Sequence, residues 1–336
     1  MEIPGNNLNT AVKDVLVERP YRLNFYFGEF FVHAVNFRAK ALDAYSTRLT
    51  EDKMFRQLPV EELKGNTEVL WLISVPVEKK LPRISLGPNS IRYVPVRYPR
   101  YYVDVQGTFS DYLQRFSSKT RRELLRQVRK FEKDSGEKPT WREFLRPDEM
   151  AEFQRAACDV SKKTYQERLL KKGVPDTADY LQGLEELAHD GRVRGYILYY
   201  GNSPIVFHIC KVQDGNLMGL QIGYDPAFGK YSPGTVEQYL LLEKLFTEKL
   251  FKRFDFGGGE SSYKQFFATG KASYADIYYY RRTVRNVFVV AMHSALAVFS
   301  DATVAVLERL KLKTWLKKFF RFRYKRQSDN GPRRAA

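Results

Sequence analysis

Residues 193–236 read VRGYILYYGNSPIVFHICKVQDGNLMGLQIGYDPAFGKYSPGTV, and this stretch decides the fold. It contains three apolar, strand-like runs at 193–201, 204–213 and 216–225, which short turns join. The second turn is Asp-Gly, which is typical of a two-residue β-hairpin because both residue types tolerate a positive φ. The pattern therefore predicts successive antiparallel strands.

The chain continues as helix, strand, helix and strand. An apolar-periodic helix is expected from Pro233 to Leu250, a short strand at 253–257, a short helix at 260–269 and a last strand at 272–283. A strand–helix–strand unit of this kind predicts a parallel crossover. The expected fold class is therefore α/β, with a mixed sheet.

Helices are also expected upstream of the hairpins, at 109–133, 147–170 and 176–190. The first of them carries an apolar stripe and a separate basic stripe at helical spacing. The basic stripe consists of Arg122, Arg126, Arg129 and Lys133. It favours either a solvated helix face or a surface that attracts an anionic acceptor or a polyphosphate donor.

The N-terminal third of the chain is expected to form a half-domain that ends near Gly107. Residues 21–37 are aromatic and β-branched, which suggests strands, and residues 69–77 are typical of a buried strand. Residues 78–106 are rich in Pro, Tyr and Arg, which favours loops and edge strands. The expected division of the chain is 1–106, 107–285, 286–326 and a disordered end at 327–336.

The net charge of +17 is concentrated in two segments. Residues 309–336 carry 11 Lys or Arg against one acid, and residues 115–133 carry eight against two, so the other 289 residues carry only about +1. A nearly neutral body argues against a nucleic-acid-binding protein. With two cysteines and four histidines, neither a disulfide framework nor a metal site is expected. The first 20 residues lack an apolar run of signal-peptide length, which favours a cytoplasmic protein.

The C-terminal segment is suited to a membrane surface. Residues 287–307 are apolar at 16 of 21 positions, and residues 310–326 (LKLKTWLKKFFRFRYKR) interleave aromatic and basic side chains. This composition favours a helix that contacts an anionic membrane through residues 309–326, at the inner face of the cell membrane. Packing, a solvated tail, a spanning helix and nucleic-acid binding are the alternatives. A span would bury Asp301 at a cost of about 3 kcal/mol near the bilayer centre.

The loop YDPAFGKYSPGTV (224–236) joins a strand end to a helix start. Backbone N–H groups and the helix dipole favour an anion at such a point, for example a pyrophosphate. Gly229 and Gly234 allow a close approach of the backbone, and Lys230 adds a positive charge. An ordinary turn is the alternative.

Three separated motifs carry a resemblance to a known family. They are KYSPGTVEQYLL (230–241), RFDFGGGESSYKQFFATG (253–270) and FSSKTRRELLRQVRKFEK (116–133). Residues 107–285 resemble the GNAT superfamily of N-acyltransferases, and within it the branch of bacterial exopolysaccharide and cellulose operons. That branch includes CelD-like proteins and is related to Fem-type aminoacyl transferases. The resemblance implies a GNAT-like fold, with residues 1–106 as a degenerate second copy.

The resemblance also implies transfer of an acyl group from a thioester to an amine. The donor is then acetyl-CoA or a longer acyl-CoA, with no metal, or an aminoacyl-tRNA as in the Fem-type relatives. The loop departs from the usual GNAT pattern, which is richer in Gly and carries Arg or Gln at its start. The expected donor-binding residues are Lys230, Tyr231, Ser232, Gly234 and Thr235.

Three residues are candidates for proton transfer. His208 has the usual pKa of a base, and a core histidine is the alternative. Asp255 stands between two phenylalanines and is a second candidate base, and capping the next loop is the alternative. The resemblance implies that Tyr263 is the acid that protonates the leaving thiolate.

Four residues are candidates for contact with the acceptor: Arg122, Arg126, Glu260 and Lys264. The two arginines would attract an anionic acceptor, whereas Glu260 either faces substrate or stabilises a helix start. Lys264 matches a lysine position of the branch, and a surface lysine is its alternative.

The acceptor is expected to be an amine on a sugar or lipid intermediate of envelope or exopolysaccharide synthesis, and a sphingoid-type amine is compatible too. Two further functions remain open. One is a tRNA-dependent aminoacyl transferase of Fem type. The other is a non-catalytic binding subunit of a polysaccharide assembly. The sequence does not predict an oligomeric state.

Overall fold

The computed structural model describes residues 16–27, 30–43, 63, 65–77, 81–135, 140–164 and 173–309. The chain forms two compact units. One is Tyr98–Ser273, and the other combines Met1–Arg97 with Tyr274–Ala336. The sequential division near Gly107 stays a prediction, but the compact unit begins earlier, at Tyr98.

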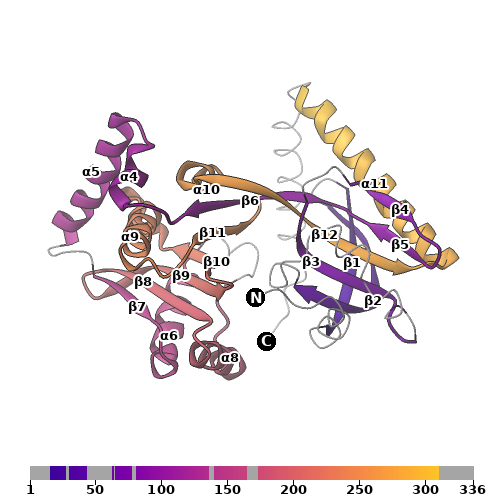
Figure 1. The fold of residues 1–336 in the computed structure, drawn as a ribbon, viewed down its shortest axis with the longest axis horizontal. Helices are drawn as coiled ribbons and strands as arrows, with labels where there is room; N and C mark the ends of the chain where they lie inside the picture. Colours follow the sequence, from indigo (N-terminus) through magenta and orange to yellow (C-terminus); the bar gives the residue numbers. More distant parts are fainter. Residues whose placement is uncertain are drawn as a thin grey trace, which may run out of the picture. The chain divides into compact units, whose positions relative to one another are not determined.

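The unit Tyr98–Ser273 is built on a mixed sheet (Figure 1). In spatial order its strands are β6 (Arg97–Asp104), β11 (Arg253–Gly258), β10 (Asn216–Tyr224), β9 (Ser203–Gln213), β8 (Val193–Tyr200) and β7 (Trp141–Phe144). Strands β8, β9 and β10 pair antiparallel, and β10 pairs parallel with β11. The predicted hairpins and the predicted parallel crossover are confirmed.

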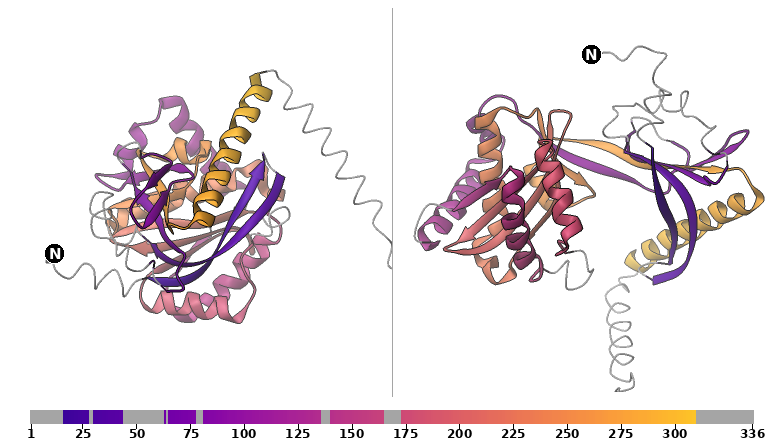
Figure 2. Two further views of the ribbon diagram at one scale, coloured as in Figure 1. Left: turned by 90° about the vertical axis from the view of Figure 1, so that its right-hand side faces the viewer. Right: turned by 90° about the horizontal axis from the view of Figure 1, so that it is seen from below.

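Helices cover both faces of this sheet, as Figures 1 and 2 show. On one face lie α4 (Phe109–Gln114), α5 (Ser118–Ser135) and α9 (Pro233–Glu248), and on the other lie α6 (Met150–Ser161) and α8 (Ala178–His189). The core under α9 contains Leu217, Leu241 and Phe254, and the core under α6 and α8 contains Phe153 and Phe207. Short helical segments are η2 (Pro147–Glu149), η3 (Pro226–Tyr231) and α10 (Ser262–Phe267).

Two expected helices differ in extent from the structure. The single helix expected at 109–133 is two helices, because the Ser117 hydroxyl accepts the Thr120 N–H at 3.2 Å and caps a new start there. The helix expected at 147–170 is shorter. It ends at Ser161, and the predicted residues 165–170 lie outside the described part of the chain.

The second unit is described by itself. Its strands are β1 (Val17–Phe27), β2 (Phe30–Asp43), β3 (Val69–Pro76), β4 (Ile84–Leu86), β5 (Ser90–Tyr93) and the C-terminal part of β12 (Gly270–Arg281). β1 and β2 form an antiparallel hairpin, and β2 pairs parallel with β3. Aromatic side chains fill its core, including Tyr93 and Tyr280.

The last described element is the helix α11 (Val284–Arg309), which confirms the expected helix at 287–307. Val290 of α11 is buried in the aromatic core of its unit. By length and composition, Val284–Thr303 is long and apolar enough to cross a membrane, and only 17% of it is buried. The predicted basic segment 310–326 and the predicted disordered end lie outside the described residues.

Candidate active site

The parallel pairing of β10 with β11 is short. Residues Asn216–Met218 pair with Arg253–Asp255, and in the described part of the chain β10 and β11 do not pair beyond these three positions. Just beyond it, β10 shifts register against β9 between Gly219 and Gln221, and β11 shifts against β6 after Asp255. Bulges of this kind interrupt the ladder and redirect side chains, and they occur often beside active sites. The two central strands therefore become irregular at the same level of the sheet.

Glycines line this irregular stretch. Gly257 has a φ of +75°, and a Cβ there would lie 3.0 Å from the carbonyl oxygen of Gly219 on the neighbouring strand. Its N–H donates to Asp255 Oδ1 at 2.7 Å. Only glycine meets both conditions without strain. The glycine triplet thus serves a close approach of two backbones at the point where β10 and β11 stop pairing.

The predicted anion loop leads into α9 as expected. Ser232 is the N-cap residue with a φ of 51°, and its side chain does not cap the helix. Its amide donates to Gly229 O at 3.0 Å, and the Thr235 amide donates to Ser232 O at 2.9 Å. Gly234 lies in the first turn, at a position where the N–H has no acceptor within a regular helix. A Cβ on Gly234 would meet nothing within 4 Å, so there is open space beside this residue.

The basic helix α5 lies next to this loop. Lys130 of α5 and Lys230 of the loop both lie over the ring of Tyr231, with Nζ at 5.7 and 4.8 Å from its centre. Tyr231 in turn stacks on Tyr200 at 5.2 Å. These ring contacts bring both lysines to the start of α9.

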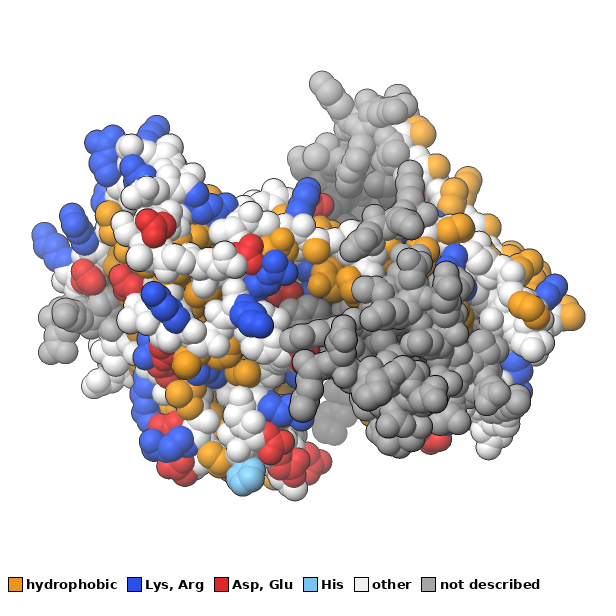
Figure 3. Space-filling view, in the orientation of Figure 1, with side chains coloured by type: hydrophobic (Ala, Val, Ile, Leu, Met, Phe, Trp, Pro, Cys, Tyr) orange, Lys and Arg blue, Asp and Glu red, His pale blue; other side chains and the backbone are white. Residues whose placement is uncertain are grey.

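A separate hollow of about 610 Å³ follows the exposed face of α5. It is lined by Arg122, Leu125, Arg126, Arg129, Lys130, Lys133 and Asp134. Figure 3 shows several blue side chains at this helix, labelled α5 in Figure 1. Arg126 is paired with Glu123 at 2.7 Å, whereas Arg122 donates to the Ser118 carbonyl oxygen. The predicted residues Arg122 and Arg126 therefore share one cationic surface, which continues through Lys130 to the anion loop.

His208 lies in the interior, behind the bulge of β10. It is 3% exposed, and its Nδ1 is 3.0 Å from Oε1 of the fully buried Glu237 on α9. A Cβ on Gly219 would lie 2.9 Å from His208 Nε2, so the imidazole supports the strand from beneath. Burial by itself lowers the pKa of His208, but Cys210 and the Glu237 carboxylate raise it more, so that its pKa lies well above the usual value.

The stability of this unit is expected to fall as the pH is raised from about 6.5, the usual histidine pKa. A histidine whose folded-state pKa is raised stabilises the fold fully below its unfolded pKa, and this contribution is lost as the pH rises through the folded value. Urea unfolding across this pH range measures the effect. The double variant His208→Gln/Glu237→Gln is the control, and an equal pH slope in both proteins would contradict the assignment.

Tyr263 of α10 lies close to the first turns of α9. Its hydroxyl donates to Gln238 Oε1 at 2.6 Å, and its ring packs against Phe256 and Phe267. Burial and the nearby Glu237 charge raise the pKa of Tyr263 well above its usual value. The hydroxyl is therefore protonated at neutral pH and holds its proton more tightly than an ordinary tyrosine does.

Asp255 is held in a buried ion pair that the sequence did not indicate. Its Oδ2 lies 3.1 Å from Arg100 Nε, and both residues are 4% exposed. Arg100 also reaches Met218 Sδ at 2.6 Å, across the paired ends of β10 and β11. A sequence pattern could not find this pair, because its members are 155 positions apart.

Glu260 and Lys264 lie beside the glycine triplet. Lys264 Nζ donates to Gly258 O at 2.7 Å, and burial lowers the pKa of Lys264, an effect that Asp255 opposes. Glu260 is exposed and accepts hydrogen bonds from Gln265 at 3.0 Å and from Tyr101 at 3.4 Å. This end of β11 therefore presents one accessible carboxylate and one partly buried amine.

The predicted residues thus fall into two groups within one unit. The loop residues and the α5 arginines lie at the start of α9, and the residues from 255 to 264 lie at the end of β11. His208 on β9 is hydrogen-bonded to Glu237 of α9, and Tyr263 on α10 is hydrogen-bonded to Gln238 of the same helix. The roles of all these residues stay predictions.

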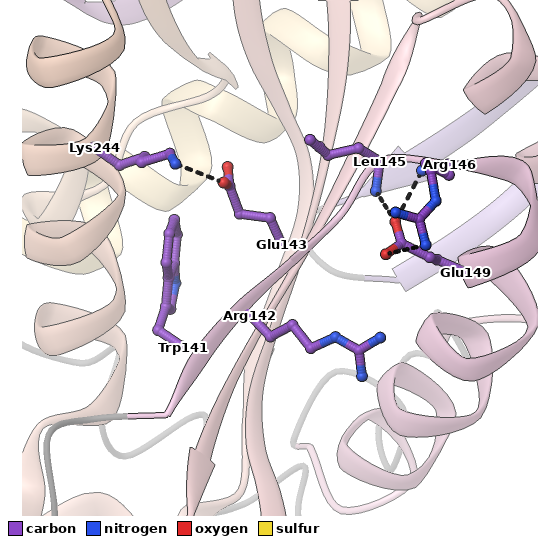
Figure 4. Close-up of a pocket in the computed structure, with 7 residues that line it drawn as sticks. All are labelled: Trp141, Arg142, Glu143, Leu145, Arg146, Glu149 and Lys244. Carbon is purple, nitrogen blue, oxygen red and sulfur yellow. Dashed lines mark hydrogen bonds and ion pairs between the residues drawn. The ribbon is translucent and has the colours of Figure 1, made fainter.

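A second cavity, of about 520 Å³, lies at the edge strand β7 (Figure 4). Its lining residues are Trp141, Arg142, Glu143, Leu145, Arg146, Glu149 and Lys244. Figure 4 shows Lys244 pointing to Glu143, at 3.0 Å, and Arg146 beside Glu149. Because these cations have acidic partners, the cavity is a weaker anion site than the start of α9. Among the described residues, no group of three or more His, Cys, Asp or Glu could hold a metal ion.

Comparison with known proteins gives a domain match and two fold likenesses. Residues 118–265 match the family model of the acetyltransferase (GNAT) domain. The crystal structure of FemX has a TM-score of 0.51 at 10% identity, covering 82% of this chain and 91% of that one. The C-terminal domain of a putative lysylphosphatidylglycerol synthetase from Agrobacterium fabrum has a TM-score of 0.50 at 9% identity, covering 86% and 90%. At these identities the likeness concerns the fold alone. No curated protein matches the chain.

Proposed function

Because residues 118–265 match the family model of the acetyltransferase (GNAT) domain, we propose that this protein transfers an acyl group from a coenzyme A thioester to an amine. One observation carries the proposal. The parallel strands β10 and β11 stop pairing, and the helix start that follows β10 has open space beside Gly234 and two lysines nearby. A pyrophosphate needs such an anion site, and we place the thioester chain at the point where the two strands separate.

The donor would bind with its pyrophosphate at the start of α9. The Gly234 N–H and the positive end of the α9 dipole would face the pyrophosphate, and Lys230 and Lys130 would add positive charge beside it. The thioester would then follow β10, where a backbone N–H at the bulge could stabilise the oxyanion. Ser232 and Thr235 hold the turn through their own backbone bonds.

Proton transfer would be divided between α10 and the β11 end. Tyr263 is the proposed acid for the leaving thiolate, because its hydroxyl stays protonated. Glu260 is the proposed base for the amine, since it is exposed whereas His208 and Asp255 are nearly fully buried. The latter two are then positioning residues, which hold β10 and β11 in place.

Calorimetric titration with acetyl-CoA and palmitoyl-CoA tests the proposal, with coenzyme A and ATP as controls. Tight binding of one ester is expected, and its chain length would identify the class of acyl group. Binding of none of these compounds would contradict the proposal and favour a non-catalytic subunit.

Replacing Gly234 with phenylalanine is expected to weaken binding of the ester about ten-fold or more, because the ring would fill the open space beside Gly234 at the proposed anion site. Thermal unfolding should change little, since no atom stands within 4 Å of the new Cβ. Gly183→Phe is the matched control, because Gly183 on α8 is equally open. Unchanged affinity of the Gly234 variant would reject the loop as the donor site.

We further propose an acceptor amine on a sugar or lipid intermediate of envelope or exopolysaccharide synthesis, handled at the cytoplasmic face of the membrane. The resemblance of 230–241 and 253–270 to CelD-like proteins supports this acceptor class. Lys264 and the α5 arginines would bind an anionic group on it. A long-chain, sphingoid-type amine fits the same chemistry. The proposal also treats the N-terminal segment as a degenerate GNAT-like half.

The alternative donor is an aminoacyl-tRNA. The observation that favours it is the length of the cationic face of α5, which exceeds what one pyrophosphate requires. Aminoacyl transfer that is lost in ribonuclease-treated extract, together with no binding of coenzyme A esters, would support this donor.

A further inference from the structure

The exposed face of α11 is apolar over nearly its whole described length. The large exposed residues are Val284, Val287, Phe288, Met292, Val298, Phe299 and Val306. Phe288 and Phe299 are each 64% exposed. Figure 3 shows orange side chains along this helix, labelled α11 in Figure 1. A helix on the surface of a soluble domain normally turns a polar side to water, whereas α11 is apolar outside as well as at Val290 inside.

The inner face of α11 carries apolar residues, such as Val290, together with hydrogen-bonded polar residues. His293 Nδ1 is 2.6 Å from the Tyr93 hydroxyl, and its Nε2 is 3.1 Å from Asn24 O. Asn286 is buried and donates to Arg281 O at 2.9 Å, and Ser300 is 7% exposed. These contacts attach one side of the helix to its own unit. These contacts set the orientation of α11 and leave its other apolar residues facing outward.

The β1–β2 hairpin touches the helix at one point, where the ring of Phe27 lies 5.8 Å from that of Phe299 on α11. Exposed aromatic and aliphatic groups along a helix mark an interaction surface. We call the outer residues of α11 the α11 surface.

We propose that the α11 surface lies in the interface of a lipid bilayer that contains anionic lipids. The proposal is independent of the acyltransferase assignment. An apolar helix face with basic residues beside it is the usual form of an interfacial helix. Arg285 at the start of α11 is paired with Glu68 at 3.0 Å, so the free charge comes from residues 309–336, which carry a net charge of +10 in the sequence. Anionic headgroups complement that charge.

Two observations favour lying in the interface over crossing the bilayer. The inner face of α11 is packed against Tyr93 and Asn24, so lipid could surround the helix only if those contacts broke. Asp301 is exposed on the outer side, where headgroups and water can solvate it. The bilayer centre would not solvate this carboxylate.

The charge also argues against a second copy of the chain as the occupant. Pairing two α11 helices would bring two strongly basic C-terminal segments together, and like charges repel. An anionic surface attracts the same segments instead.

Flotation of the full-length protein with vesicles tests the proposal. One set of vesicles contains phosphatidylcholine alone, and the other contains phosphatidylcholine mixed with phosphatidylglycerol. The wild type is expected to bind the anionic set, less strongly as salt is raised. The variant Phe288→Ser/Phe299→Ser is expected to bind at least about ten-fold more weakly, since it loses the apolar area of two rings and no charge.

Leu250→Ser is the matched control, because Leu250 is 62% exposed in the other unit, and it should bind as the wild type does. Equal thermal unfolding of the three proteins would show that all are folded. Wild-type affinity in the double variant would overturn the proposal. So would a wild-type dimer that the double variant disperses, without vesicle binding, because the occupant would then be a second copy.

Discussion

Tyr263→Phe is expected to lower kcat by about two to four orders of magnitude, the usual range for loss of a general acid. The hydroxyl is held at 2.6 Å from Gln238 Oε1, and burial raises its pKa well above the usual value. The group is therefore protonated at neutral pH, and in the proposed mechanism this proton passes to the thiolate as it leaves. Without it, the thiolate would have to leave unprotonated or take a proton from water.

The measurement is steady-state kinetics with the ester that calorimetry identifies, alongside the affinity for that ester. The affinity should change little, because the ring and its contacts with Phe256 and Phe267 remain. Phe266→Leu, a change at an exposed neighbouring ring, is the control. An unchanged kcat would remove Tyr263 from the proposed mechanism while leaving the donor site untouched.

Asp255→Ala is expected to lower the free energy of unfolding by about 3–5 kcal/mol, because it leaves the Arg100 guanidinium buried without its carboxylate. The same change removes the acceptor of the Gly257 N–H, at the point where β10 and β11 stop pairing. Urea unfolding measures the loss.

The double variant Arg100→Met/Asp255→Leu separates the charge from the packing. Replacing a buried ion pair with apolar residues of similar size is often nearly neutral, so this protein should be more stable than the single variant. Ester binding should still fall in the double variant if the pair positions the groove. A loss below about 1 kcal/mol in Asp255→Ala, the range of an exposed pair, would contradict the buried ion pair.

Local pattern was a good guide to the elements of the Tyr98–Ser273 unit. The Asp-Gly turn and the alternating apolar residues predicted the hairpins, because turn type and side-chain period depend on neighbours in the chain. The parallel crossover followed from the order of strand, helix and strand. Residues 109–133 were predicted as one helical stretch, although the Ser117/Ser118 pair is a capping pattern for its basic part, and the Ser117 cap marks where α5 begins.

The candidate site was only partly predictable. The anion loop was found because strand end, glycines and helix start are contiguous in sequence. Arg100, Glu237 and Gln238 were missed as partners, because each meets its partner only after the sheet and α9 are assembled. Burial, which separates the exposed Glu260 from the enclosed His208, is likewise a property of the assembled unit.

The sequence by itself determined the strand and helix order, the place of the anion loop and the apolar composition of the last helix. These depend on residues that are close along the chain. Only the tertiary structure decided which side of α11 faces its own unit, which carboxylates reach solvent and which charges pair. Those outcomes depend on contacts between distant segments, such as Arg100 with Asp255 and His293 with Tyr93, and no local pattern encodes them.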